Sequence, residues 1–378
     1  MVRIKKILKR MMIIIVIILA LVGIVAFFIL RQPQFGKAPS GHRLERIKQS
    51  PNYKDGKFQN RFPTPILPEG YTMAGEIYRT FFRKNPRKFP TDSIPSVKTN
   101  LHNLPTDSNI LVWFGHSSYF MQIDGKRFLI DPVLSGSASP MPFGVKSFKG
   151  TDIYTTDDIP EIDYLLISHD HFDHIDYKTV MALKPKIKHI VCGLGVGEHF
   201  EYWGFDTNKI MEKDWDETLN IDENYFIHTA TAKHGSGRFE WTDNTLWLSF
   251  IIEAPTFKVY VGGDSGYDVH FAEIGGKFGS IDLAILDNGQ YGQEEFGYTI
   301  HMSPKYALQA SQDLKAKRLF PVHSSKFVLS RHPWDEPLVR ITELSKETQT
   351  SLITPMIGEL VRLNDNTQTF TEWWKGIN

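Results

Sequence analysis

The chain has 378 residues, 41% hydrophobic and 23% charged, so it can form one large domain with extensions or two domains, and it is too apolar to be disordered. Its 43 Lys and Arg residues balance 43 Asp and Glu residues, which argues against a general attraction to nucleic acid. A single cysteine, Cys192, excludes a disulfide framework and a cysteine-rich zinc site, which leaves the 14 histidines as candidates for metal binding or acid–base chemistry.

The first 30 residues predict a transmembrane signal-anchor. Residues 1–10 contain five Lys or Arg residues and no acid, and residues 11–30 contain no charged or polar side chain. A helix of that length, rising about 1.5 Å per residue, covers the roughly 30 Å hydrocarbon core of a bilayer. A cleaved signal peptide is the alternative, but its apolar region usually has only about 7–15 residues and ends in small residues. The run here ends in Phe27-Phe28-Ile29-Leu30, which offers no such cleavage site.

We therefore expect a single-pass protein of the cell membrane. Cationic residues are denser before the span than after it, which favours an amino terminus inside the cell. Residues 1–10 would then form a short basic cytoplasmic tail, and the catalytic part would be extracytoplasmic. Residues 31–107 hold 10 of the 21 prolines and predict a proline-rich tether and amino-terminal extension that wraps onto the main domain.

Residues 108–378 predict one domain of the α/β (α+β) class, with two packed sheets covered by helices. Apolar runs and turn signals predict strands at residues 110–114, 119–123, 127–130, 162–167, 189–192, 225–232, 246–252, 258–261, 283–286 and 318–322. Helices are predicted at residues 177–183, 196–202, 304–314 and 337–345.

The chemistry is concentrated directly after the strand at residues 162–167, in a run that reads Ser-His-Asp-His-Phe-Asp-His. A loop at the end of a buried strand is a place where a rigid scaffold presents side chains to one point. Alternate residues of an extended stretch share a side, so His169 and His171 can face one metal ion. Asp173 and His174 can face a second ion after a turn. Imidazole and carboxylate ligands together suit zinc, iron or manganese.

This run resembles the H-x-H-x-D-H signature of the metallo-β-lactamase superfamily. Three later motifs resemble that superfamily in the same order, namely Ala232-Lys233-His234-Gly235, Gly262-Gly263-Asp264-Ser265-Gly266 and Pro321-Val322-His323. The resemblance implies an αββα sandwich that holds two divalent metal ions, zinc in the first place with iron or manganese as alternatives. By that resemblance the ligands are His169, His171 and His234 for the first ion, Asp173, His174 and His323 for the second, and Asp264 as the bridge.

Within the superfamily, the sequence most resembles N-acylphosphatidylethanolamine-hydrolysing phospholipase D and its bacterial relatives. Shared stretches include residues 131–140 (D-P-V-L-S-G-S-A-S-P), 263–267 (G-D-S-G-Y) and 301–304 (H-M-S-P), and the likeness spans residues 111–329. It implies a phosphodiesterase that acts on N-acylphosphatidylethanolamine-like lipids through a hydroxide shared by the two metal ions. The family pattern H-W-G-T-F becomes H-S-S-K-F at residues 323–327, which changes the pocket wall.

Further residues around this site have expected roles. Asp173 would orient the hydroxide, and His301 would bind the substrate phosphate or protonate the leaving group. His116 is expected either to contact substrate or to be a structural histidine. Asp131 is expected to orient a ligand, and Asp170 to be a solvated or supporting carboxylate.

Three alternatives to the phosphodiesterase remain. A lactonase or other carbonyl hydrolase would act on a small soluble substrate, and a non-catalytic scaffold would keep the metals for stability. A nuclease is disfavoured by the neutral charge, so no nucleic-acid partner is expected. The expected partners are the lipid bilayer and a phospholipid or small-molecule substrate, and no oligomer interface can be read. Residues 78–82 and 291–298 are rich in aromatic residues and are candidate walls of a lipid groove.

Overall fold

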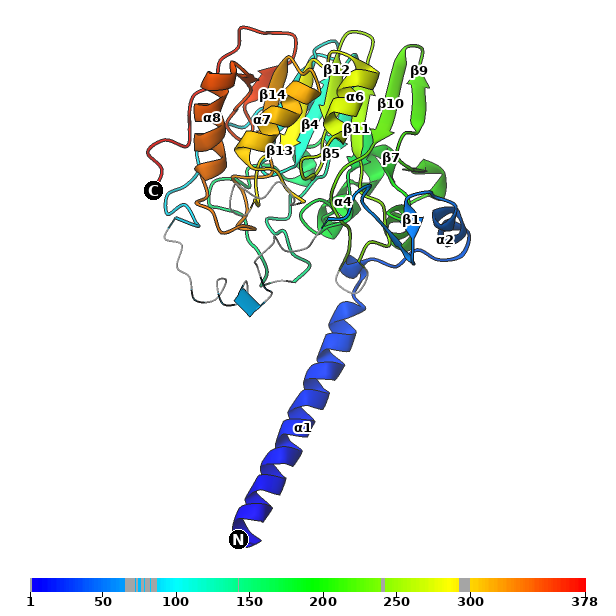
Figure 1. Ribbon diagram of the computed structural model, residues 1–378, viewed down its shortest axis with the longest axis vertical. Helices are drawn as coiled ribbons and strands as arrows, with labels where there is room; N and C mark the ends of the chain where they lie inside the picture. Colours follow the sequence, from blue (N-terminus) through cyan, green and yellow to red (C-terminus); the bar gives the residue numbers. More distant parts are fainter. Residues whose placement is uncertain are drawn as a thin grey trace.

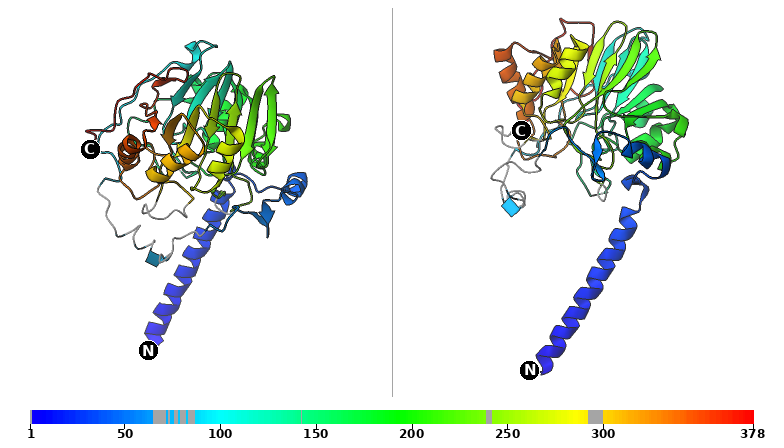
Figure 2. Two further views of the ribbon diagram at one scale, coloured as in Figure 1. Left: turned by 45° about the horizontal axis from the view of Figure 1, so that its top comes forward. Right: turned by 45° about the vertical axis from the view of Figure 1, so that its right-hand side comes forward.

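The computed structural model describes residues 2–64, 72, 74–75, 78, 82, 87–141, 143–238, 242–291 and 300–378. Two seven-stranded sheets lie face to face, and helices cover both outer faces (Figure 1 and Figure 2). This is the αββα sandwich that the sequence predicts. Most of the predicted groove segments, residues 78–82 and 291–298, lie outside the described residues.

The first sheet has the strand order β16-β3-β4-β5-β6-β7-β8. Its strands are β3 (Ile110–Trp113), β4 (Tyr119–Ile123), β5 (Lys126–Ile130), β6 (Ile162–Ile167), β7 (Ile187–Gly193), β8 (Ile210–Lys213) and β16 (Leu360–Arg362). Strands β5 to β8 run parallel to one another. The outer face is covered by α4 (Tyr177–Leu183) and α5 (Gly197–Tyr202), whose Val180 and Phe200 pack in one apolar cluster with Leu165 of β6.

The second sheet has the strand order β15-β14-β13-β12-β11-β10-β9. Its strands are β9 (Thr218–Asp222), β10 (Tyr225–Ala230), β11 (Ser249–Glu253), β12 (Lys258–Val261), β13 (Leu283–Asp287), β14 (Arg318–Val322) and β15 (Ser351–Leu352). Strands β12 to β15 run parallel. Its outer face is covered by α6 (His270–Phe278), α7 (Pro304–Asp313) and α8 (Glu336–Thr348), through side chains such as Phe271, Leu308 and Ile341.

The main core lies between the two sheets. Side chains of the first sheet, such as Met121 and Leu166, meet side chains of the second, such as Ile252 and Phe320, and all four are at most 1% exposed. Burying each such side chain stabilises the fold by about 1.5–3 kcal/mol. The parallel strands of both sheets are thereby fixed, so the loops that follow them start from rigid positions.

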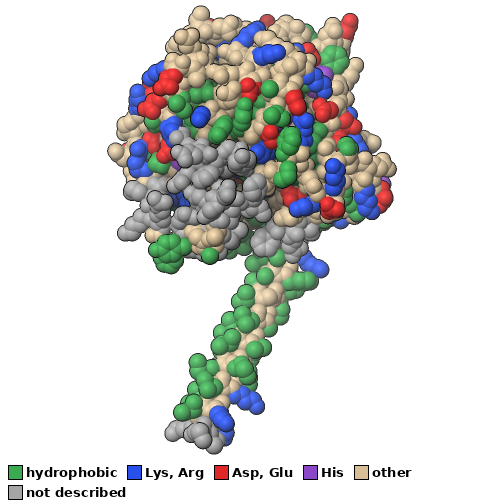
Figure 3. All heavy atoms as spheres, in the orientation of Figure 1, with side chains coloured by type: hydrophobic (Ala, Val, Ile, Leu, Met, Phe, Trp, Pro, Cys, Tyr) green, Lys and Arg blue, Asp and Glu red, His purple; other side chains and the backbone are tan. Residues whose placement is uncertain are grey.

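The amino-terminal helix α1 (Val2–Leu30) projects away from the globular body. Its segment Ile4–Leu30 is long and apolar enough to cross a membrane, by length and composition. Its described side chains are mostly exposed and apolar, with cations near the amino-terminal end (Figure 3). The helix starts before the predicted span of residues 11–30, because the basic residues before residue 11 continue the same helix.

The residues that follow α1 lie against the body. They form a 3-10 turn η1 (Pro33–Phe35), helix α2 (Gly41–Lys48) and a short hairpin of β1 (Tyr53–Lys54) and β2 (Lys57–Phe58). Phe35, Ile47 and Phe58 from this stretch are at most 3% exposed. Arg43 of α2, only 7% exposed, forms ion pairs with the carboxylates of Glu198, Glu201 and Glu212 at 2.6–2.8 Å. These contacts fix the stretch on the first sheet and α5.

Candidate metal centre

All seven predicted ligands meet at the edge of the sandwich where the parallel strands end. Each follows a strand: four residues follow β6, and one follows each of β10, β12 and β14. Among the described residues, ligand atoms lie within 4.8 Å of one another in four overlapping groups. The groups are His169, His171 and His234; His169, His174 and Asp264; His116, Asp173, His174 and His323; and Asp264, Asp287, His301 and His323.

Three imidazoles form one side of the cluster. Nδ1 of His171 lies 2.8 Å from Nε2 of His169 and 3.2 Å from Nε2 of His234. Nitrogens that bind one tetrahedral zinc ion at about 2.0–2.1 Å are roughly 3.3 Å apart, so this spacing fits a shared cation. The other ring nitrogen of His234, Nδ1, lies 3.0 Å from the carbonyl oxygen of Ile300 and donates to it. The lone pair of His234 Nε2 is thereby turned to the cluster.

His174 anchors the opposite side. Its Nδ1 donates to Oδ2 of Asp131 at 2.8 Å, which leaves Nε2 as the nitrogen that faces the cluster. That Nε2 is buried, accepts no hydrogen bond from the described residues, and lies 3.7 Å from Oδ2 of Asp173. A buried nitrogen without a hydrogen bond is costly unless something absent from the chain satisfies it. A cation meets that requirement.

The carboxylate of Asp264 lies between the two sides and is 3% exposed. Its Oδ2 is 3.1 Å from Nε2 of His174 and 3.7 Å from Nε2 of both His169 and His234. Its Oδ1 is 3.0 Å from Nδ1 of His323 and has no hydrogen-bond partner among the residues that the structure describes. One carboxylate therefore reaches ligand atoms on both sides, which is the position that a bridging ligand requires.

A tightly packed turn holds Asp264 against the loop that carries the first histidines. Gly263 has a φ of 58°, and a Cβ at this position would lie 2.6 Å from Cβ of Ser168. Asp131 binds the same Ser168, since it accepts from the backbone nitrogen at 2.9 Å and from Oγ at 2.6 Å. The expectation that Asp131 orients a ligand therefore fits its hydrogen bond to His174.

The electrostatics of the cluster suit a cation. Burial lowers the pKa of His169, His234 and His323 well below the usual value, so these imidazoles are neutral at pH 7. Burial opposes ionisation of Asp264, but the neighbouring His174 and His323 hold its pKa well below the usual value. Burial likewise opposes a charge on His174, but surrounding carboxylates, Asp264 foremost, raise its pKa, so His174 must release a proton before it can bind a metal ion. Neutral imidazoles and ionised carboxylates are the protonation states that bind metal.

His301 and His116 occupy different places around the cluster. Nδ1 of His301 lies 2.7 Å from Oδ2 of Asp287, and His301 lines the large cavity described below. Burial raises the pKa of Asp287 to about 7, while its contact with His301 acts in the opposite direction. His116 is 1% exposed, and its Nε2 lies 3.1 Å from Oδ2 of Asp173. Its position therefore supports a ligand carboxylate, and its predicted substrate contact stays a prediction.

Asp170 is not a solvated carboxylate, so that alternative in the sequence analysis was wrong. It is 2% exposed, and its Oδ2 lies 3.0 Å from Nε2 of His199. Its Oδ1 accepts from the backbone nitrogen of Gly237 at 2.7 Å. His199 carries no sequence motif that predicts a role in the site. Here it is buried behind the metal loop, which we define as residues 168–176.

Arg238 holds the metal loop from behind and was not identified from the sequence. Its guanidinium is buried and donates to the carbonyl oxygens of Asp170 at 2.8 Å and Ile175 at 3.1 Å. A third bond, 2.7 Å long, reaches the carbonyl oxygen of Gln34, just after helix α1. The guanidinium also lies 4.1 Å from the ring centre of Phe172.

The segment that leaves α1 makes further contacts with this region. The ring of Phe35 packs edge-on against Phe172 of the metal loop, with ring centres 5.9 Å apart. The backbone nitrogen of Lys37 donates to Nδ1 of His199 at 3.0 Å. Trp203 Nε1 donates to the carbonyl oxygen of Pro33 at 2.7 Å. Residues 32–37, which we call the exit segment, are therefore packed against the metal loop through Phe172 and against α5 and its C-cap through His199 and Trp203.

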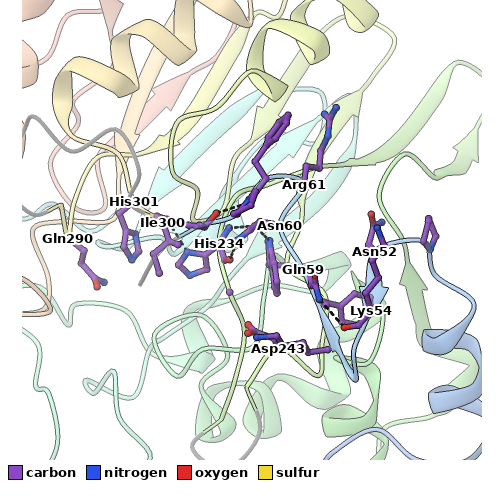
Figure 4. Close-up of a pocket in the computed structure, with 18 residues that line it drawn as sticks. Asn52, Lys54, Gln59, Asn60, Arg61, His234, Asp243, Gln290, Ile300 and His301 are labelled. Atoms are coloured by element: carbon purple, nitrogen blue, oxygen red, sulfur yellow. Dashed lines mark hydrogen bonds between the residues drawn. The ribbon is translucent and has the colours of Figure 1, made fainter. Parts of the chain in front are cut away.

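A cavity of about 1200 Å³ opens beside the cluster. His234, His301 and Gln290 line it from the metal side, and residues 51–52, 54 and 57–64 line it from the amino-terminal extension (Figure 4). The lining includes apolar side chains such as Phe62 and cationic ones such as Lys57. Drug-sized ligands occupy pockets of about 300–1,000 Å³, so this cavity has room for a large, amphiphilic substrate.

Comparisons with known proteins agree with this geometry. The sequence profile described as Beta-lactamase superfamily domain matches residues 126–324. An uncharacterised protein of Mycobacterium tuberculosis is 33% identical over 335 residues, which cover 87% of this chain and 88% of that protein. The N-acyl-phosphatidylethanolamine-hydrolyzing phospholipase D 1 of Caenorhabditis elegans is 27% identical over 308 residues, 71% of this chain and 86% of that one. Igni18, a metallo hydrolase from Ignicoccus hospitalis, shares the fold with a TM-score of 0.51 and 19% identity, covering 67% of this chain and 97% of that one.

Proposed function

Because this chain belongs to the metallo-β-lactamase superfamily of metal-dependent hydrolases, we propose that it binds two divalent metal ions, zinc in the first place, and hydrolyses a phosphodiester bond of a membrane phospholipid. The residues that would hold the ions are His169, His171 and His234 on one side, Asp173, His174 and His323 on the other, and Asp264 for both. Two such ions supply an activated water and neutralise charge on phosphoryl oxygens.

The observation that carries this proposal is the position of Asp264. Its two carboxylate oxygens reach His169 and His234 on one side and His174 and His323 on the other, at 3.0–3.7 Å. A site for a single ion needs only one of these sets. Two sets that share one carboxylate support a pair of ions, and a pair of ions suits an in-line displacement at phosphorus.

The exit segment supports a lipid substrate. Phe35 is five positions after the end of α1 at Leu30, and an extended chain over five steps spans at most about 18 Å. Phe35 contacts Phe172, the neighbour of the predicted ligand Asp173. If α1 crosses the bilayer, the metal cluster lies close to the lipid headgroups. The cavity beside it holds both apolar and cationic side chains, as a phospholipid requires.

The chain's own residues would then position the reactants and move a proton. His116 holds Asp173 by a 3.1 Å hydrogen bond, which fixes the carboxylate that would orient the water. Asp287 binds Nδ1 of His301, so Nε2 of His301 would deliver the proton to the leaving oxygen. The buried position of Asp287 fixes the ring of His301 at the edge of the cavity.

An Asp287→Asn substitution is expected to lower kcat by about 100-fold, the smaller end of the range for general acid catalysis, with little change in KM. The amide keeps the shape of Asp287 but removes the charge that holds a proton on His301. Steady-state kinetics on a soluble phosphodiester would measure this. Asp216→Asn, at a side chain that is 67% exposed, is the matched control. An unchanged kcat in Asp287→Asn would remove His301 from the proton transfer.

The function itself is tested with the full-length protein in detergent micelles, loaded with zinc and offered three substrates. They are N-acylphosphatidylethanolamine, bis(p-nitrophenyl) phosphate and a sugar lactone. We expect N-acylethanolamine and phosphatidic acid from the lipid, detected by mass spectrometry, and p-nitrophenol from the second substrate. A protein that holds two metal ions per chain and cleaves neither phosphodiester would contradict the proposal. Cleavage of the lactone alone would support the carbonyl hydrolase instead.

For topology, we propose that α1 stays uncleaved and that the globular body is outside the cytoplasm. The cations of residues 1–10 and the apolar segment Ile4–Leu30 support this arrangement. Protease added to intact cells or spheroplasts should then digest the body but leave a short anchored fragment. Protection of the body until the membrane is opened would reverse the orientation.

A further inference from the structure

The amino-terminal extension forms part of the wall of the active-site cavity. Among the residues that line it, Lys54, Gln59, Asn60 and Arg61 come from the extension, more than 100 positions before the first predicted ligand. In Figure 4 Asn60 lies next to His234, which is itself one of the predicted ligands. A segment with no metal-binding motif therefore lies within contact distance of the metal site.

Asn60 contacts the backbone of His234 directly. Its Nδ2 donates to the carbonyl oxygen of His234 at 2.8 Å, and its Oδ1 accepts from the backbone nitrogen of His234 at 3.1 Å. One side-chain amide thus satisfies both backbone groups of a predicted ligand. Oδ1 also accepts from Nε1 of Trp247 at 3.1 Å, and Trp247 is 2% exposed.

The ring of His234 is fixed separately, by its 3.0 Å bond from Nδ1 to the carbonyl oxygen of Ile300. With the ring held at Nδ1 and the backbone held by Asn60, the direction of Nε2 is determined from two independent segments of the chain. The side chain of His234 is 1% exposed, so solvent does not compete for these positions. Supporting hydrogen bonds of this kind set the orientation of metal-binding imidazoles.

The extension is itself anchored on both sides of Asn60, so the amide is held in place. Phe58 is 1% exposed, and its backbone nitrogen donates to the carbonyl oxygen of Asp243 at 2.7 Å. Arg61 forms a two-bond ion pair with the carboxylate of Glu273 on α6. Asn52 Nδ2 donates to Oδ1 of Asp214 at 2.8 Å. Each of these partners belongs to the sandwich and not to the extension.

We infer that Asn60 is a positioning residue for the metal centre, which fixes the backbone of His234 so that its Nε2 points at the first metal ion, and that residues 51–64 thereby join the substrate wall to the metal site. The inference rests on the part of the proposed function that makes His234 a metal ligand. It needs no assumption about the substrate.

The test uses cobalt, which gives a visible absorption spectrum that reports the geometry around the ion. The full-length protein in detergent is stripped of metal and titrated with Co²⁺ against a chelator. Asn60→Asp keeps the shape and both accepted bonds but replaces the donor Nδ2 with an oxygen that faces the carbonyl oxygen of His234. We expect the affinity for the first Co²⁺ to fall about 10–100-fold and the spectrum to change in intensity and position. Asn60→Ser, which cannot span both backbone groups, should act in the same direction.

Asn220→Asp is the matched control, because Asn220 is exposed on β9, the edge strand of the second sheet, and does not line the cavity. Its affinity and spectrum should match those of the unmodified protein. Thermal unfolding of the metal-free proteins separates positioning from general stability. A folded Asn60 variant with unchanged cobalt affinity and spectrum would overturn the inference, whatever its thermal midpoint. Cobalt binding is read without substrate, so an unmodified protein that binds cobalt but cleaves no phosphodiester would defeat the proposed function and leave this test intact.

Discussion

An Asp264→Asn protein is expected to lose both high-affinity metal binding and hydrolysis. The amide has the shape of the carboxylate but carries no charge, and Asp264 is the group that reaches both halves of the cluster. Loss of a merely supporting partner typically costs 10–100-fold in metal affinity, so loss of the shared ligand should cost more than about 100-fold. Several kcal/mol of transition-state stabilisation would go with it, which lowers kcat on the order of 1,000-fold.

Metal content by elemental analysis and the kinetics of p-nitrophenyl phosphodiester hydrolysis measure the two losses together. Zinc should also raise the thermal midpoint of the unmodified protein, because a ligand that binds only the folded state stabilises it. That shift should vanish in Asp264→Asn. Asp222→Asn, at a side chain that is 65% exposed, serves as the control. Two bound ions per chain in the Asp264→Asn protein would show that Asp264 is no ligand.

Replacing Arg238 with methionine is expected to destabilise the protein and weaken the metal centre at the same time. The substitution removes the donors for the carbonyl oxygens of Asp170, Ile175 and Gln34. A buried polar group that loses its partner costs about 1–3 kcal/mol, so the three together should cost about 3 kcal/mol or more. In a protein of this size, that corresponds to a thermal midpoint lower by roughly 5–10 °C.

The affinity for metal should also fall, because Asp170 and Ile175 lie on either side of the predicted ligands His171, Asp173 and His174 in the metal loop. Differential scanning fluorimetry of the metal-free protein and chelator competition would follow the two effects separately. Arg362→Met is the matched control, because Arg362 is exposed on the edge strand β16. If Arg238→Met keeps the midpoint and affinity of the control, the metal loop does not depend on this contact.

The sequence was a good guide to elements whose apolar pattern is local. Strands β4, β6, β12 and β14 lie at the predicted residues, and α4 does as well. The strands that were missed are β1, β2, β8, β9, β15 and β16, which have only two residues or lie at the edges of the sheets. In β9 the Asn and Asp residues of an exposed face dilute the apolar signal, because only alternate residues are half-buried.

Helix α6 was missed for a different physical reason. It contains Gly275 and Gly276, which lower helix propensity by about 1 kcal/mol each relative to alanine. Gly275 is required here because a Cβ would lie 2.0 Å from the carbonyl oxygen of Asp313 at the end of α7. Glycine therefore lowers the helix propensity of α6 but allows close packing on α7. The sequence of α6 alone does not show this packing, because the neighbouring helix is distant in the chain.

Some residues of the site could likewise be identified from the sequence, and others could not. The predicted ligands were found because each follows an apolar strand and carries a short motif, and the structure brings all seven together. Asp287 also ends a strand, β13, and that position could have identified it. Asn60 and Arg238 act on residues 174 and 68 positions away, with no motif around either. Only the folded chain shows such partners.

The packing of the exit segment on the metal loop has a kinetic consequence. Three hydrogen bonds hold the exit segment on the globular body, and they join Pro33 to Trp203, Gln34 to Arg238 and Lys37 to His199. No flexible linker therefore separates the end of α1 from the catalytic face. If α1 crosses the bilayer and the proposed lipid substrate is correct, the enzyme cannot sample the bulk solution through a flexible linker and would meet lipids by lateral diffusion in two dimensions. Its rate should then follow the mole fraction of substrate in the bilayer and not its total concentration. A soluble protein that begins at Gln34 would lack the carbonyl oxygen of Pro33, which accepts a hydrogen bond from Nε1 of Trp203. A soluble protein that begins before Gln32 keeps this hydrogen bond and therefore preserves the site better.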